Sequence, residues 1–156
     1  MLPGDRLVCV FVESLAVGSR FTAWPLHVTI VPWFRLALSS DDVLMGLQKV
    51  TASIHPFTVV MDDDARFGRR KQKLVNLVSL PSPLNSVEQA VRKFLKASGA
   101  WLVDETTKRR LPYRPHVTAQ GNEGLQRSAG FWCEKLYLIE QLGSAKTVAG
   151  IVGLTQ

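Results

Sequence analysis

The chain has 156 residues, 46% of them hydrophobic and 21% charged. This composition excludes a mainly disordered or fibrous protein and predicts a single folded domain over residues 1–156. The formal net charge of +6 favours anionic partners such as RNA, nucleotides or acidic lipid. Two isolated cysteines, Cys9 and Cys133, indicate buried free thiols rather than a disulfide framework or a metal site.

The first third of the chain predicts two strands and a helix. Residues 7–12 are a continuous apolar, β-branched run, and residues 27–34 are again strand-like, with Pro32 expected to end regular pairing. The run 7–12 is too short for a signal sequence or a membrane span, so we expect a cytoplasmic protein without membrane contact. Capping residues from Ser39 and helical spacing of apolar residues then predict a helix over about 40–54.

The rest of the chain predicts further strands and a second helix. Residues 57–61 and 74–80 predict strands joined by a polar segment, and Ser82-Pro83 begins a second helix that Gly99 ends. Further strands are expected at 116–119, 136–142 and 147–152. Each half therefore carries one strand with a His-x-Thr motif and one helix, as a duplicated unit would.

Two of the three histidines begin identical His-Val-Thr triplets, at His27 and His116. Since side chains alternate across a strand, His27 shares a face with Thr29, and His116 with Thr118. Each pair can thus address one ligand. One such triplet is more often structural, but two copies on equivalent elements, 116 − 27 = 89 residues apart, favour function.

These residue types suit phosphodiester cleavage. Two imidazoles, whose ordinary pKa is about 6.5, can divide the roles of general base and general acid. Threonine hydroxyls can donate hydrogen bonds to the phosphate oxygens on which charge develops. The scheme requires neither metal nor cofactor, and the sequence has no cluster with recognisable metal-ligand spacing. The third histidine, His55, precedes a proline at the expected helix end, where a cap or dipole role is the better interpretation.

Two segments, residues 26–34 (LHVTIVPWF) and 113–119 (YRPHVTA), resemble the paired motifs of the 2H phosphoesterase superfamily, especially its bacterial 2',5' RNA ligase-like branch. The order of elements, the motif separation and the aromatic residue three positions before the second histidine agree over nearly the whole chain. The resemblance implies a two-lobed α+β fold with pseudo-twofold symmetry, in which antiparallel sheets surround a central cleft and helices lie outside.

The resemblance also implies metal-independent cyclic phosphodiesterase activity on 2',3'-cyclic phosphates or related nucleotide and RNA-end substrates. Position by position, it makes His27 and His116 the acid and base pair, and Thr29 and Thr118 the hydroxyls that hold the phosphate. Which histidine is the acid, and whether the product carries a 2' or a 3' phosphate, stays open.

One position departs from the family pattern. Many members have a basic residue near the position held here by Gly121. Arg114 is a candidate replacement, because it shares the face of His116 if the strand extends that far, although a solvated surface role is an equal alternative. Tyr113 and Trp24 could stack on a base, whereas core packing is the stronger interpretation for Trp33.

Two basic runs could guide an RNA backbone, although such runs usually form solvated surface. They are Arg66, Arg69, Arg70, Lys71 and Lys73, and Lys108, Arg109 and Arg110. The chief alternative is therefore a non-catalytic RNA-binding module that keeps the cleft without turnover. A third interpretation, that both triplets are structural, predicts that the two histidines lie far apart. We expect a monomer.

Overall fold

The computed structural model describes residues 2–106, 112–120, 124–125 and 128–155. Within these residues it contains ten strands, two α-helices and one short 3-10 helix. The strands are β1 (Arg6–Phe11), β2 (Arg20–Phe21), β3 (His27–Arg35), β4 (Phe57–Phe67), β5 (Lys73–Val78), β6 (Trp101–Leu102), β7 (His116–Thr118), β8 (Gly130–Cys133), β9 (Lys135–Leu142) and β10 (Ala145–Gly153). The helices are α1 (Ser40–Val50), α2 (Ser82–Ala97) and the 3-10 helix η1 (Val103–Thr106).

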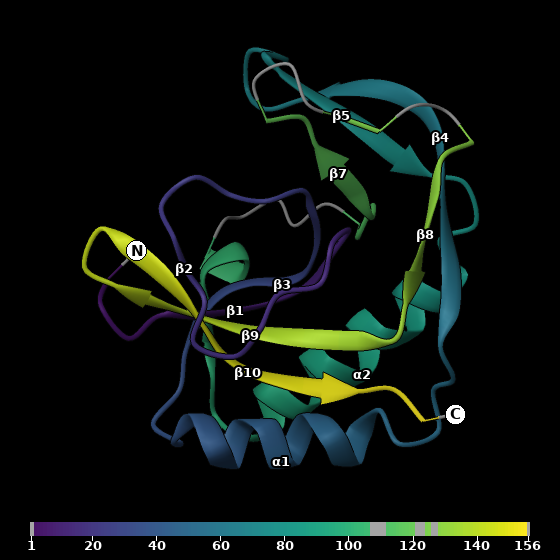
Figure 1. The fold of residues 1–156 in the computed structure, drawn as a ribbon. Coiled ribbons are helices and arrows are strands. Elements are labelled where there is room, and N and C mark those ends of the chain that lie inside the picture. The colour runs from purple at the N-terminus through teal and green to yellow at the C-terminus, as the bar shows by residue number, and fades with distance from the viewer. Residues whose placement is uncertain (1, 107–111, 121–123, 126–127, 156) are drawn as a thin grey trace.

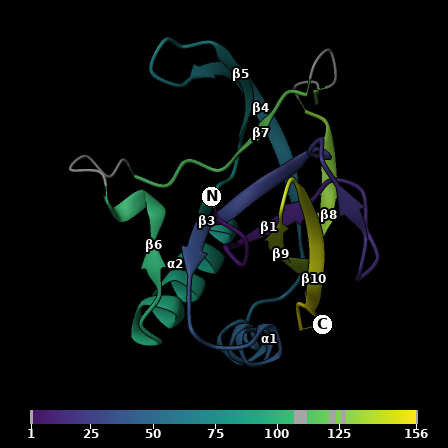
Figure 2. The same cartoon turned by 90° about the vertical axis from the view of Figure 1, so that its left-hand side faces the viewer.

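The described strands form one antiparallel sheet in the order β2-β10-β9-β1-β3-β7-β5-β4-β8. The short strand β6 lies off this path and pairs with the end of β3. The sheet curls, so that β4, β5, β7 and β8 stand above the part formed by β1, β3, β9 and β10 (Figure 1). Both helices lie below, away from the β4–β5 hairpin, as the turned view confirms (Figure 2). The motif strands β3 and β7 are neighbours at the centre of the sheet.

The two faces of the sheet bury different groups. The face toward the helices holds the larger core, in which Val28 and Val117 pack with α1 residues such as Leu47 and α2 residues such as Val91. The helices approach closely because Gly46 of α1 has no side chain where the ring of Phe94 packs. The opposite, concave face has a smaller apolar cluster. Because residues alternate along β3, His27 and Thr29 point to this concave face.

The fold expected from the sequence is confirmed, namely a mixed α and β structure with antiparallel strands and the helices outside. Helix α1 is shorter than predicted and ends at Val50, where the Thr51 hydroxyl donates to the Leu47 carbonyl at 2.8 Å. His55 therefore lies beyond the helix, and its proposed cap role is wrong. Its Nδ1 contacts the Thr155 carbonyl oxygen at 3.0 Å instead.

The strands also differ from prediction in three places. Pro32 does not end β3, because the strand bulges there: residues 31–34 of β3 face only residues 6–8 of β1. The polar segment after Met61 continues β4 as far as Phe67. The short strands β2, β6 and β8 were not predicted. Both cysteines are free and buried, as expected. Among the described residues, no helix combines the length and apolar character that crossing a membrane requires.

Candidate active site

The register of β3 and β7 brings the two His-Val-Thr triplets together. Val28 pairs with Val117, so in this antiparallel ladder His27 stands opposite Thr118 and Thr29 opposite His116. All four side chains share the concave face. A local twofold axis near the Val28–Val117 pair relates the triplets, and the histidines occupy diagonal positions, which in a sheet are about 7 to 8 Å apart. The interpretation that places the histidines far apart is therefore wrong.

Each imidazole is anchored in the same way. Nδ1 of His27 lies 2.8 Å from the Pro25 carbonyl oxygen, and Nδ1 of His116 lies 2.7 Å from the Arg114 carbonyl oxygen. A carbonyl oxygen only accepts hydrogen bonds, so each Nδ1 carries the proton and donates. The neutral tautomer therefore leaves Nε2 with a lone pair on both rings. Each Nε2 can accept a proton and, once charged, return it.

The surroundings lower the pKa of both imidazoles. For His27 the chief cause is burial, which the hydrogen bond to Pro25 opposes and the nearby His116 reinforces. Burial is also the chief cause for His116, again opposed by the hydrogen bond to Arg114, and the positive charges of Arg114 and Lys73 reinforce it. His116 helps to lower the pKa of His27 because the two rings occupy neighbouring positions across the two strands.

Aromatic side chains pack against the half-buried His27. The Trp24 ring stacks on it with centroids 4.3 Å apart and an interplanar angle of 28°, and the Phe11 ring lies 6.1 Å away. Lys146, which is only 8% exposed, places its Nζ 5.5 Å from the centroid of Trp24. This side of the site is therefore packed with aromatic groups.

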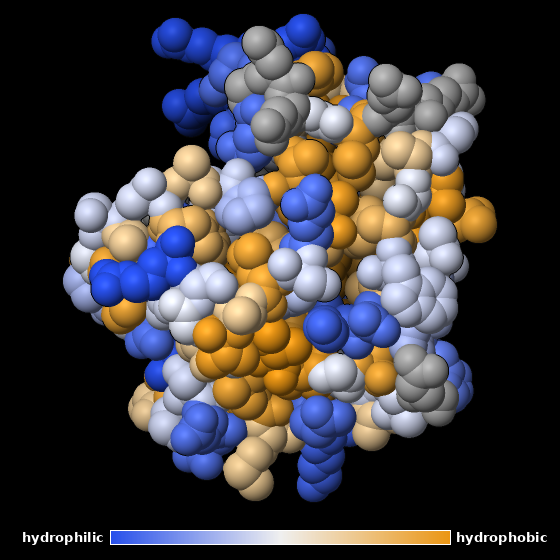
Figure 3. All heavy atoms as spheres, in the orientation of Figure 1, coloured by the Kyte–Doolittle hydropathy of each residue, from blue (hydrophilic) through white to orange (hydrophobic). Residues whose placement is uncertain are grey.

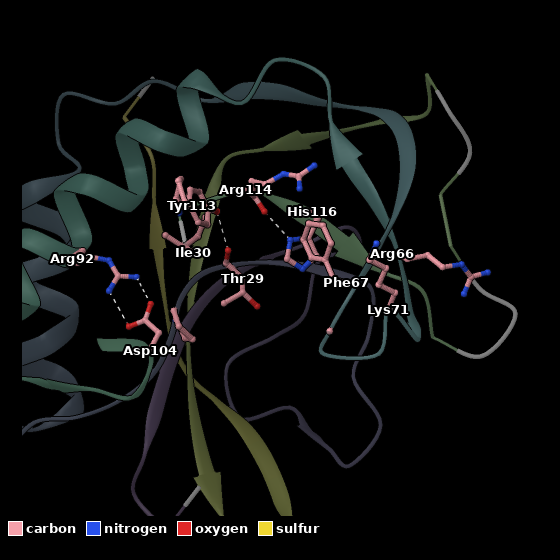
Figure 4. A pocket seen from close by; sticks show the side chains of 13 residues that line it. Thr29, Ile30, Arg66, Phe67, Lys71, Arg92, Asp104, Tyr113, Arg114 and His116 are labelled. Carbon is pink, nitrogen blue, oxygen red and sulfur yellow. Dashed lines mark hydrogen bonds and ion pairs between the residues drawn. The ribbon is translucent and has the colours of Figure 1, made fainter. Parts of the chain in front are cut away.

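His116 has a more open and more cationic environment. The Phe67 ring contacts it edge-on, with centroids 4.7 Å apart, and the Arg114 guanidinium lies over Phe67 at 5.0 Å. Thr29 and His116 lie in the middle of the site, with Phe67 and Lys71 on one side and Tyr113 on the other (Figure 4).

A cavity of about 600 Å³ opens on the His116 side. Thr29 and His116 line it, whereas His27 and Thr118 do not. Its far end holds Arg92, whose guanidinium donates to both Asp104 carboxylate oxygens, at 2.7 and 3.0 Å, and to Glu88 at 2.6 Å. The lining residues are Thr29, Ile30, Pro32, Arg66, Phe67, Gly68, Lys71, Arg92, Asp104, Pro112, Tyr113, Arg114 and His116.

Of the three residues expected to contact substrate, Tyr113 and Arg114 line the cavity and Trp24 does not. Tyr113 lines the cavity, but its hydroxyl donates to the Thr29 carbonyl at 2.9 Å, and burial raises its pKa well above the ordinary value. Trp24 stacks on His27. The strand β7 begins at His116 and does not extend to Arg114, so the strand-face argument does not apply to Arg114, although its side chain still lines the cavity. Trp33 packs with the smaller apolar cluster, as expected.

Sequence reasoning missed part of the cavity wall. Phe67 fell in the polar segment predicted between two strands, and Arg66 and Lys71 were considered only as an RNA guide, yet all three line the cavity. The positive φ of Gly68 (97°) and of Lys71 (52°) folds the β4–β5 turn back toward His116. The absent cation at Gly121 and the second basic run, 108–110, lie outside the described residues. Within those residues, no three His, Cys, Asp or Glu side chains could together hold a metal ion.

Comparison with solved structures shows the same fold over almost the whole chain. A phosphoesterase matches with a TM-score of 0.65 and 15% identity, covering 99% of this chain and 100% of that one. Escherichia coli LigT complexed with 3'-AMP gives 0.63 and 15%, with the same coverage. TT0787 of Thermus thermophilus gives 0.64 and 14%, covering 96% and 97%. No curated protein matches the chain.

The family comparison identifies the class of protein. The family model described as the 2'-5' RNA ligase superfamily matches residues 8–144, a span that includes both triplets and most of the sheet. The chain belongs to this superfamily, and the resemblance read from the two motifs is confirmed.

Proposed function

We propose that this protein is a phosphodiesterase that opens 2',3'-cyclic phosphates, or related phosphodiesters at nucleotide and RNA ends, by two-histidine acid and base catalysis without a metal. The observation that carries the proposal is the placement of His27, Thr29, His116 and Thr118 on one face of two paired strands. Family membership and the nucleotide in the LigT complex, 3'-AMP, support the substrate class.

The proposed reaction uses both Nε2 atoms. The neutral imidazole takes a proton from the attacking water, whose oxygen forms a new bond to phosphorus. The bond from phosphorus to one ribose oxygen breaks, and the charged imidazole protonates that oxygen. The Nδ1 bonds to Pro25 and Arg114 fix the orientation of both rings. Because the backbone arrangement is nearly symmetric, either histidine can serve as the acid.

The threonines and the neighbouring cations stabilise the added negative charge. Thr29 and Thr118 flank the histidines on the same face, where their hydroxyls can donate to the non-bridging oxygens. Arg66, Lys71 and Arg114 line the adjoining cavity and attract the phosphate. They provide the positive charge that the second motif lacks at Gly121.

The test is turnover of uridine 2',3'-cyclic phosphate by His27→Ala and His116→Ala, each with and without a chelator. We expect each variant to lose about 10²- to 10⁴-fold in kcat, the usual contribution of a general acid or base. We expect the chelator to leave wild-type activity unchanged. His55→Ala is the matched control and keeps full activity, because His55 contacts the Thr155 carbonyl outside the site.

Retained activity in both histidine variants, or complete loss on chelation, would contradict the mechanism. Salt-dependent RNA binding by the wild type without turnover of any cyclic phosphate would instead favour a non-catalytic RNA-binding module.

A further inference from the structure

The hairpin formed by β4 and β5 concentrates positive charge beside the proposed site. Residues 65–74 contain five basic and no acidic side chains, against a net charge of +6 for the whole chain. All five basic side chains are exposed: Arg66, Arg69, Arg70, Lys71 and Lys73. Strongly hydrophilic side chains accordingly gather at the upper left of the molecule, where this hairpin projects (Figure 3).

These five cations divide into two groups. Arg66 and Lys71 line the cavity, and Lys73 is close enough to lower the pKa of His116. Arg69 and Arg70 do not line the cavity. Among the residues that the structure describes, their guanidinium groups form no ion pair. Two exposed arginines therefore carry charge that neither the fold nor the proposed reaction uses.

The position of Arg69 and Arg70, the outer pair, follows from the strand register. Phe67, the last residue of β4, faces Lys73 and contacts the His116 ring, and Arg69 and Arg70 follow in the turn. Since a strand advances about 3.3 Å per residue, the outer pair lies at most about 10 Å beyond Phe67. That length corresponds to two or three stacked nucleotides at about 3.4 Å each.

The cavity next to the histidine pair opens on the His116 side. His116 lines it together with Phe67 and Lys71 of the hairpin, whereas Trp24 and Phe11 pack against the half-buried His27. A substrate longer than a mononucleotide that extends through this cavity therefore runs toward the hairpin. Phe67 and the Arg114 guanidinium over its ring are the first groups that the next nucleotide would meet.

We propose that the outer face of the β4–β5 hairpin, through Arg69 and Arg70, binds the backbone of a single-stranded RNA whose terminal phosphodiester lies at the histidine pair. This inference rests on the proposed function and narrows it: the preferred substrate is an RNA end rather than a free cyclic mononucleotide. The arginines contact phosphates without reading sequence, so they add affinity uniformly and in a salt-dependent way.

The test compares uridine 2',3'-cyclic phosphate with a short oligouridylate that ends in the same cyclic phosphate. At low salt the wild type should turn over the oligonucleotide with the higher kcat/KM. The R69A/R70A variant should lose roughly tenfold on the oligonucleotide, as expected when steering charges are removed, and nothing on the mononucleotide. The control K49A/K93A removes two exposed lysines from the helices and should leave both substrates unaffected.

Direct binding separates this inference from the proposed reaction. Binding of a short oligouridylate with an unreactive 3' end is measured by fluorescence anisotropy over a salt series. In R69A/R70A the slope of log affinity against log salt should fall by about 0.7 for each phosphate that the variant no longer neutralises. Loss of oligouridylate binding in this variant supports the RNA-binding role of Arg69 and Arg70, even if the wild type turns over no cyclic phosphate. Absence of turnover would overturn only the proposed function. If R69A/R70A binds oligouridylate as the wild type does, or prefers the oligonucleotide as strongly as K49A/K93A does, the RNA-binding role of the hairpin is overturned.

Discussion

His27 and His116 have equivalent backbone positions but different neighbours. Both rings lie on paired central strands, face a threonine across the ladder and donate from Nδ1 to a carbonyl two residues earlier. His27 is half-buried and stacked on Trp24, whereas His116 borders a cavity whose wall carries Arg66, Lys71 and Arg114. The repeated motif thus provides two similar titrating groups, and the loops around it decide on which side a substrate can lie.

The same comparison extends one strand outward on each side. Val10 pairs with Val28, and Asn76 pairs with Val117, so the local twofold axis exchanges a buried valine with a buried asparagine. The Asn76 side chain donates to Asp64 at 2.6 Å and accepts from the Leu125 backbone at 3.0 Å. The β5 side therefore uses a polar residue to hold the segment after β7, which the β1 side does not need.

After the two histidines, the largest effect should come from the threonines, which test the symmetric part of the site. Thr29→Val and Thr118→Val keep the shape and remove the hydroxyl, so each should lower kcat on uridine 2',3'-cyclic phosphate by about 10²- to 10³-fold. Steady-state kinetics measures this loss, and Thr147→Val, whose hydroxyl contacts the Ser19 carbonyl, is the control. A loss in only one of the two variants would show that one hydroxyl does not contact the phosphate.

The buried amide tests the asymmetric part of the fold. Asn76→Val leaves the Asp64 carboxylate and the Leu125 amide without this partner, which should lower the free energy of unfolding by about 1 to 3 kcal/mol. Denaturant unfolding measures the change. Gln48→Ala, which removes an exposed side-chain hydrogen bond, should change it by less than about 0.5 kcal/mol. A neutral Asn76→Val variant would mean that the amide contributes no net stability.

A smaller effect separates the two aromatic partners. Trp24→Leu and Phe67→Leu each remove a ring contact worth about 0.5 to 1.5 kcal/mol, with rate losses up to about tenfold. Because Phe67 lines the cavity and Trp24 does not, Phe67→Leu should also raise KM, whereas Trp24→Leu should lower kcat alone. The exposed Trp132 provides the control Trp132→Leu. Equal effects of Trp24→Leu and Phe67→Leu on KM would remove the proposed difference between the two sides.

The central strands could be predicted because their signals are local. The apolar run of β1, the two His-Val-Thr triplets and the helical periodicity of α2 are each contained within a few residues. The edge strands β2, β6 and β8 are short, and their pairing depends on neighbours far away in the chain. Residues 62–64 are three consecutive aspartates and fell in the polar segment predicted to join two strands, but Asp64 faces Asn76 of β5 and β4 continues.

The chemistry of the motifs could likewise be predicted, but the cavity could not. The alternation of a strand gives the shared face of His27 and Thr29, and the antiparallel register then brings in His116 and Thr118. The cavity wall combines the β4–β5 turn with residues from α2 and the segment before β7. No local pattern signals this convergence, because it depends on the curl of the sheet.

The most direct test of the two-histidine pair is the pH dependence of kcat/KM for uridine 2',3'-cyclic phosphate, which reports the free enzyme. Burial lowers the pKa of both imidazoles, so their apparent values belong to the coupled pair and lie below about 6.5. We predict a bell-shaped profile with its maximum below about pH 6.5, where one ring is charged and the other neutral. A profile that is flat from about pH 5 to pH 8, or that rises throughout this range, would contradict the two-histidine mechanism.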